Sequence, residues 1–245
     1  MPASSNFQEA IREANYGSLV GPNVVNRALP YVGGGMVLTA AGVLGGLSLL
    51  ASNAGLFMPL LWVALIGNFI LYFVAQNVAA KAANSTALPL LSAYSLLTGF
   101  TLSGIVSYAL NAAGVGAVGT AALATGITFV VASVVGRRMT DNVGQALASA
   151  VGLGVVGLIV AMLVQVIGSI FAPAIFAGGI FELMIAGLGT VLFVGAAFVD
   201  FYTMPRFYRD DQYLAGALSM YLTYINLFVF ILRLIVALQG GGRRD

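Results

Sequence analysis

The chain has no cysteine and no histidine among its 245 residues. These absences exclude disulfides, thiolate metal sites and cysteine nucleophiles, together with the imidazole groups that most often bind metals or transfer protons. Charged residues make up only 7% of the chain, against roughly 25% in soluble proteins. With a formal net charge of +2, nothing favours a nucleic-acid partner. The expectation is a protein that is not an enzyme and has no resident cofactor.

Apolar residues, in contrast, make up 60% of the chain and fall in long runs between short polar stretches. One helix needs about 20 apolar residues to cross a hydrocarbon core roughly 30 Å thick. The pattern predicts an all-α integral membrane protein in a lipid bilayer, with seven transmembrane helices at residues 30–52, 57–79, 88–110, 115–135, 146–170, 177–204 and 213–238. The predicted organisation is a cytoplasmic N-terminal segment (1–29), a transmembrane domain (30–238) and a polar C-terminal tail (239–245).

The basic residues predict how the chain is oriented, because cytoplasmic ends of membrane proteins carry more Lys and Arg than outer ends. With a cytoplasmic N-terminus, only Arg243 and Arg244 lie outside. The inner side then holds Arg12, Arg27, Lys81, Arg137, Arg138, Arg206 and Arg209. This asymmetry favours an N-terminus inside and a C-terminus outside, in the plasma membrane of a prokaryote.

Glycines within the predicted helices form two groups, Gly42 with Gly46, and Gly152 with Gly154 and Gly157. Small residues allow the backbones of neighbouring membrane helices to approach closely. Both groups are therefore predicted to be packing sites.

Three charged residues lie within the predicted spans, and ionisable groups inside a membrane are candidates for a functional site because burying them is costly. Glu182 and Arg233 have opposite signs and similar depths near the outer side, which predicts an ion pair between helices. The alternative is that they line an outer vestibule. Asp200 lies near the cytoplasmic end of its helix, among apolar neighbours.

The last predicted helix carries a polar stripe. Ser219, Thr223, Asn226 and Arg233 are spaced by four, three and seven residues, which brings them to one helical face. Such residues either line an ion path or form hydrogen bonds within and between helices. The second to fourth helices offer further polar side chains that could complete a seam around this stripe: Asn68, Gln76, Thr98, Thr101, Ser103, Thr125 and Thr128.

In the same helix the sequence reads ALSMYLTYINLF at 217–228 and LRL at 232–234. This segment closely resembles the signature of the transmembrane Bax inhibitor motif family. Further matches are GFTLS at 99–103, ATGITF at 124–129 and Asp200. The resemblance covers most of the chain after about Val20.

The resemblance implies that the seventh helix lies at the centre, between two layers of three helices. It also implies a pH-sensitive calcium leak, a role in stress tolerance and the modulation of membrane proteases. Two aspartates share a proton and gate the path in calcium-leak members; Asp200 matches the first, and Thr223 stands where the second is found. Asp200, Ser219, Thr223 and Asn226 are thus the predicted ion pathway and pH sensor, with Asp200 as a weak calcium site.

Two functions remain open at this point. One is a channel-like, pH-sensitive leak for calcium or other cations with a stress-protective role. The other is a non-conducting regulator of other membrane proteins, such as a quality-control protease, that binds through its glycine-rich helix faces. An intramembrane aspartyl protease would need two aspartates, whereas the spans offer only Asp200.

Overall fold

The computed structural model describes residues 19–172, 176 and 179–241. In this part of the chain, seven helices are long and apolar enough to cross a membrane, which confirms the predicted fold class. They are α2 (Val24–Ser52), α3 (Ala54–Ala80), α4 (Asn84–Ala113), α5 (Val115–Val135), α6 (Asp141–Phe171), α8 (Ile180–Phe207) and α9 (Tyr213–Gly241), with the short 3-10 helices η1 (Gly136–Arg138) and η2 (Asp210–Gln212). Residues 1–18 of the predicted N-terminal segment and 242–245 of the predicted tail lie outside the described residues.

Four helices, α2, α3, α4 and α6, begin before the predicted boundary, and the first three contain a proline near the start: Pro30 in α2, Pro59 in α3 and Pro89 in α4. The predicted starts place these prolines in the first turn, where a missing N–H costs no hydrogen bond. In the structure, each of these three helices begins at least one turn before its proline. The Asn53 side chain accepts a hydrogen bond from the Leu56 N–H, which allows α3 to begin at Ala54.

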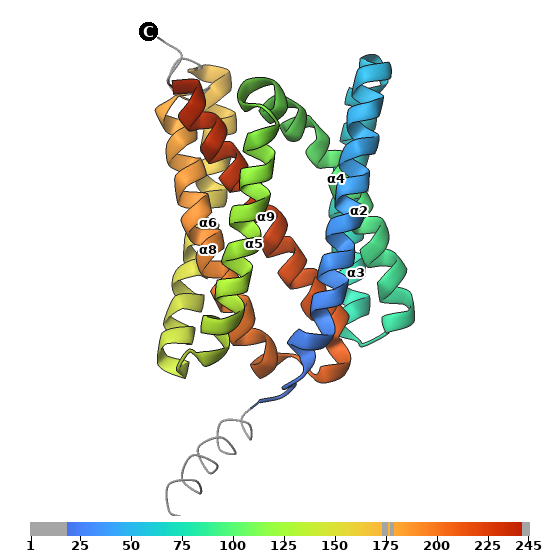
Figure 1. The fold of residues 1–245 in the computed structure, drawn as a ribbon, viewed down its shortest axis with the longest axis vertical. Coiled ribbons are helices and arrows are strands. Elements are labelled where there is room, and N and C mark those ends of the chain that lie inside the picture. The colour runs from blue at the N-terminus through green and yellow to red at the C-terminus, as the bar shows by residue number, and fades with distance from the viewer. Residues whose placement is uncertain (1–18, 173–175, 177–178, 242–245) are drawn as a thin grey trace, which may run out of the picture.

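Helix α9 occupies the centre of the bundle. It packs against α2, α3, α4, α5 and α8, and Figure 1 shows it crossing obliquely between α2, α3 and α4 on one side and α5, α6 and α8 on the other. Its fully buried side chains include Leu214, Leu218, Met220, Tyr221, Leu227 and Leu232. Side chains from both layers therefore surround α9 along most of its length.

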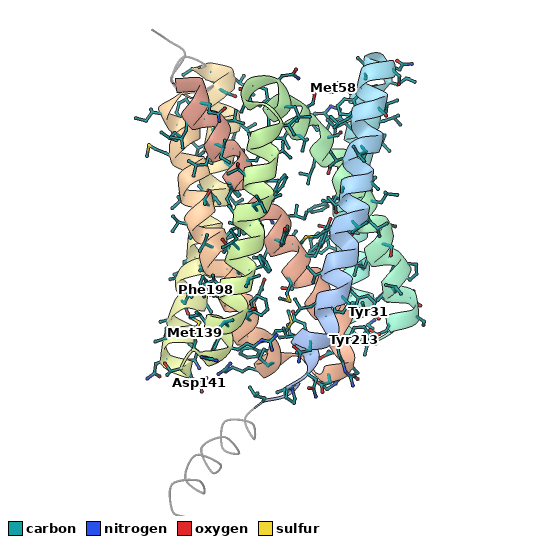
Figure 2. The ribbon with its side chains drawn as sticks, in the orientation of Figure 1. Tyr31, Met58, Met139, Asp141, Phe198 and Tyr213 are labelled. Atoms are coloured by element: carbon teal, nitrogen blue, oxygen red, sulfur yellow. The ribbon has the colours of Figure 1, made fainter. Side chains whose placement is uncertain are left out.

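The outer helices present large apolar side chains to the surroundings, as the projecting sticks in Figure 2 show. Trp62 and Phe69 of α3 are 65% and 66% exposed, and Leu153 of α6 is 76% exposed. A protein in water would not expose so much continuous apolar surface. These faces are suited to the hydrocarbon chains of a lipid bilayer.

Helices α2 and α4 are in backbone contact at the glycines that the sequence singles out. A Cβ atom added to Gly42 would overlap the Leu96 carbonyl oxygen, and one added to Gly46 would overlap Ser103. The reciprocal contact comes from Gly99 of α4, where a Cβ would overlap the carbonyl oxygen of Thr39. The packing prediction is confirmed for this pair of helices.

The prediction is only partly right for α6. A Cβ on Gly154 would meet Leu192 of α8, but Gly152 and Gly157 have open space beside them. The difference arises because α6 lies at the edge of the bundle, with α8 as its main neighbour. Two of the three glycines in this group consequently face away from the protein.

A prediction follows from the backbone contact between α2 and α4. The substitution Gly99→Ala should destabilise the protein by about 1–3 kcal/mol, because a rigid carbonyl group occupies the space that the new methyl group needs. Gly104→Ala in the same helix is the matched control, since no atom lies within 4 Å of a Cβ at that position. The measurement is the thermal unfolding midpoint of each variant in detergent. Equal midpoints for the two variants would show that the contact is not tight.

Candidate functional site

Asp200 of α8 directs its carboxylate toward α9. The Ser219 hydroxyl donates a long hydrogen bond of 3.5 Å to Asp200 Oδ1, and the Thr223 side chain lies beside the same carboxylate. Asp200 Oδ2 is buried and has no hydrogen-bond partner among the described residues. Buried carboxylate oxygens are normally compensated by donors or cations. Asp200 is therefore an unsatisfied acceptor in the protein interior.

Other oxygen atoms gather around this carboxylate. Tyr208, in the turn after α8, has Asp200, Ser219 and the α3 side chains Tyr72 and Gln76 as neighbours. Gln76 Oε1 is a second buried oxygen without a partner among the described residues. We name Asp200, Ser219, Thr223, Tyr208 and Gln76 the Asp200 cluster. Carboxylate, amide and hydroxyl oxygens are the ligand types that calcium prefers.

The Asp200 cluster contains a single carboxylate. Among the residues that the structure describes, no group of three or more His, Cys, Asp or Glu side chains lies close enough to hold a metal ion. A high-affinity calcium site needs several carboxylate or carbonyl ligands. The chemistry of the cluster is thus suited to weak, transient binding of a cation.

Asn226 does not join the cluster, although the sequence places it on the same face of α9. Its side-chain nitrogen donates to the Leu222 carbonyl oxygen of its own helix at 2.9 Å. Asn226 lies about one turn beyond Thr223. It is farther from the end of the bundle that carries Arg137, Arg138 and Arg206, which we call the basic end. The structure therefore brings Ser219 and Thr223 to Asp200 and leaves Asn226 with a local bond.

The other polar residues of the spans divide in a similar way. Gln76 belongs to the Asp200 cluster, while Asn68 of α3 hydrogen-bonds Thr98 of α4 at 3.1 Å. The remaining candidates donate to carbonyl oxygens of their own helices: Thr101, Ser103, Thr125 and Thr128. Sequence reasoning missed Tyr208, which follows α8, and Tyr72, which lies within α3, because the position of an aromatic residue in an apolar segment does not separate a site from the core.

Glu182 and Arg233 meet near the opposite end of the bundle. Arg233 Nε and Nη2 donate to the two carboxylate oxygens of Glu182, both at 2.8 Å, and Gln165 of α6 donates to the same carboxylate at 2.9 Å. The guanidinium also lies over the Phe230 ring, 5.4 Å from its centroid. Paired hydrogen bonds of this kind are strong and directional. The interaction joins α6, α8 and α9.

A comparison with known families identifies the family of this chain. The family model described as inhibitor of apoptosis-promoting Bax1 matches residues 21–240. The chain belongs to this Bax inhibitor motif family. The predicted resemblance is confirmed, and the match contains both the Asp200 cluster and the Glu182–Arg233 pair.

Bacterial relatives are similar over most of this Bax inhibitor family chain. An uncharacterised membrane protein of Streptococcus pyogenes serotype M1 is 33% identical over 180 residues, covering 70% of this chain and 72% of the relative. An uncharacterised protein of Deinococcus radiodurans is 30% identical over 239 residues, covering 89% of this chain and 90% of the relative. A shorter match is to Bax inhibitor 1 of Schizosaccharomyces pombe, which is 33% identical over 60 residues, covering 24% of this chain and 23% of the relative.

The geometry of the pair predicts strong coupling between Glu182 and Arg233. Arg233→Leu should lower the thermal unfolding midpoint, because it leaves a half-buried carboxylate without its partner. Adding Glu182→Gln should recover part of this loss, giving a coupling energy of about 1–3 kcal/mol in a double-mutant cycle.

The exposed pair Arg209–Asp211, with side chains 59% and 56% exposed, is the matched control. Its coupling should be below about 1 kcal/mol, since solvent screens an exposed pair. Additive losses at Glu182 and Arg233 would show that the two residues do not stabilise each other.

Proposed function

We propose that this Bax inhibitor family membrane protein is a slow, channel-like leak for calcium or other cations, with Asp200 as the charged station on the path. The observation that supports this function is the unpartnered Asp200 Oδ2, together with a second unpartnered oxygen on Gln76, which neighbours Tyr208 as Asp200 does. A passing cation would compensate both oxygens. A stress-protective role would follow from adjusting cation levels across the membrane.

A single carboxylate is better suited to a leak than to a site that binds calcium tightly. Conduction requires binding that is strong enough for entry and weak enough for release. Ser219 and Thr223 offer neutral oxygens beside Asp200, so the site can replace part of a hydration shell without holding the ion tightly. Protonation of Asp200 in acid would remove the only charge of the cluster and lower the flux.

The packing of α9 limits how fast such a leak can be. Tyr221 is fully buried and its hydroxyl shares a short hydrogen bond with Thr39 of α2. Side chains therefore fill the centre of the bundle beyond the Asp200 cluster. Passage requires a movement of α9 against its neighbours, which is the basis for proposing slow flux.

A second function is favoured by the exposed glycines of α6. Gly152 and Gly157 face away from the protein with open space beside them, and exposed small residues allow another membrane helix to approach. On this proposal the protein does not conduct ions and instead regulates a partner such as a quality-control protease. Purified protein in liposomes separates the two functions, because the regulator alone would give no flux.

The decisive experiment measures calcium entry into liposomes that contain the protein and a calcium-sensitive dye. Asp200→Asn should reduce the flux roughly tenfold, equivalent to about 1.4 kcal/mol in the barrier. Wild-type flux should be lower at about pH 5 than at about pH 8, because acid neutralises the carboxylate, and the variant should lose this dependence.

Asp211→Asn is the matched control, since this carboxylate lies at the same end of the bundle but is exposed and paired with Arg209. It should keep the wild-type flux. Unchanged flux in Asp200→Asn would place the path elsewhere, and absence of wild-type flux would favour the regulator.

We also propose that the end of the bundle with Arg137 and Arg206 faces the cytoplasm, as the basic residues indicate. Single cysteines at Thr140 and Phe207 should resist an impermeant thiol reagent in intact cells, while cysteines at Asn53 and Asn111 should react. All four positions are exposed, and the chain has no cysteine of its own. The reverse labelling pattern would invert the topology.

A further inference from the structure

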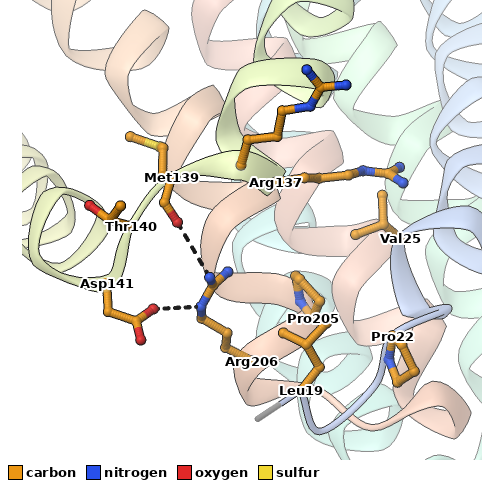
Figure 3. Close-up of a pocket in the computed structure, with 10 residues that line it drawn as sticks. Leu19, Pro22, Val25, Arg137, Met139, Thr140, Asp141, Pro205 and Arg206 are labelled. Atoms are coloured by element: carbon orange, nitrogen blue, oxygen red, sulfur yellow. Dashed lines mark hydrogen bonds and ion pairs between the residues drawn. The ribbon is translucent and has the colours of Figure 1, made fainter. Parts of the chain in front are cut away.

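A pocket of about 550 Å³ opens at the basic end of the bundle, apart from the Asp200 cluster. Its polar wall consists of Arg137, Arg138 and the turn Met139 to Asp141, with Arg206 of α8 opposite (Figure 3). Its apolar wall consists of Leu19, Pro22, Val25 and Pro205. Three guanidinium groups therefore share the pocket with one carboxylate, that of Asp141.

Arg206 neutralises this carboxylate. Its Nε donates to Asp141 Oδ1 at 3.0 Å and its Nη2 donates to the Met139 carbonyl oxygen at 3.4 Å. The guanidinium also stacks on Tyr202, 4.1 Å from the ring centroid. Arg206 thus fixes the turn between η1 and α6, and the positive charge that remains in the pocket belongs to Arg137 and Arg138.

These two arginines have donors to spare. Arg137 Nη2 donates one hydrogen bond at 3.1 Å to the neutral side chain of Asn26, and the guanidinium has five N–H donors in total. Arg138 forms no hydrogen bond or ion pair with any residue that the structure describes. Two positive charges in one pocket repel each other, and an anion bound in the pocket lowers this cost.

The start of α6 adds to the positive potential. Thr140 and Asp141 line the pocket, and the Thr140 side chain does not cap the helix. The first turn of a helix has unsatisfied N–H groups and the positive end of the helix dipole, which together favour an anion. The helix runs for 31 residues, from Asp141 to Phe171.

We propose that this pocket binds a phosphate group, carried either by an anionic lipid headgroup or by a soluble phosphate compound. Guanidinium groups match the geometry of phosphate oxygens. The pocket lies at the ends of membrane-spanning helices, where headgroups are found, and its apolar wall can contact the carbon atoms next to a lipid phosphate. Phosphate binding in this pocket would be the same whether or not the protein conducts ions.

The test measures the thermal unfolding midpoint of the purified protein in a neutral detergent. Three additions are compared: dioleoylphosphatidylglycerol, dioleoylphosphatidylcholine, and sodium phosphate against sodium chloride at equal ionic strength. A ligand of the folded state raises the midpoint with concentration. Phosphatidylglycerol should raise it more than phosphatidylcholine, whose choline group carries a positive charge into the site.

The double variant Arg137→Gln, Arg138→Gln should need at least about tenfold more phosphatidylglycerol for half of the maximal rise. Arg138→Gln alone should show part of this shift with an unchanged midpoint before addition, because Arg138 has no bond to lose among the described residues. Arg209→Gln removes an equal charge outside the pocket and should respond like the wild type.

A similar rise with sodium phosphate would identify a soluble phosphate as the ligand and would support the site. The proposal is overturned if neither phosphatidylglycerol nor phosphate acts on the wild type. It is also overturned if the double variant and Arg138→Gln both respond as the wild type does.

Discussion

A helix that is enclosed by other helices inside a bilayer has no water for its polar side chains, and α9 is in this position. Each polar group of α9 must find its partner on α2, α3, α4, α5 or α8, or in its own backbone. Tyr221 bonds to Thr39, Asn226 bonds to its own helix and Arg233 binds Glu182. The arrangement of the surrounding helices follows from these demands as much as from apolar packing.

The two carboxylates of the spans show the two outcomes of this constraint. Glu182 has a guanidinium and an amide donor on its oxygens, so its position is explained by stability alone. Asp200 has one long bond from Ser219 and an oxygen without a partner in the described structure. An apolar side chain at Asp200 would be less costly to bury, and a role in cation passage is a reason for a carboxylate to be there.

The sequence allowed the fold class and the number of spans to be predicted because long apolar runs have few structural alternatives. It also allowed the contact at Gly42 and Gly46 to be predicted, since small residues four apart form a flat helix face. The same reasoning was wrong for Gly152 and Gly157 because composition does not show whether a face meets protein or lipid. Helical spacing likewise placed Asn226 beside Thr223, but could not show that its amide bonds to Leu222.

Partners from distant parts of the chain were the least predictable. Gln76 was one of seven equivalent polar residues, and only the packing of α3 against α9 and beside the turn after α8 separates it from Thr125 or Thr128, which bond within their own helix. Tyr208 had no signal at all, because it lies in a turn whose direction the sequence does not encode. The starts of α2, α3 and α4 were also predicted too late. The predicted starts place a proline in the first turn, but a helix can begin one turn or more before it.

The polar contacts at the two ends of α9 differ in strength, and this bears on how a path past Asp200 could open. At one end the Glu182–Arg233 pair is partly buried and has two short bonds. At the basic end, the Asp210 carboxylate binds Asn23 and Gln212 binds the Ala80 carbonyl oxygen, all at exposed positions. Exposed polar contacts contribute little to stability because water replaces them readily.

Figure 2 shows Tyr31 and Tyr213 in contact at this same end, with their rings 5.2 Å apart. This contact and the exposed hydrogen bonds add to the buried apolar packing of Leu214 and Leu218, which holds the start of α9 against its neighbours. A movement of α9 near Asp200 would therefore have to separate buried apolar side chains as well as these polar contacts, and it could leave the Glu182–Arg233 pair at the other end intact. Among the described residues Asp200 is the carboxylate with a buried oxygen that lacks a partner, and the tight packing around it means that any passage through the proposed path would be slow.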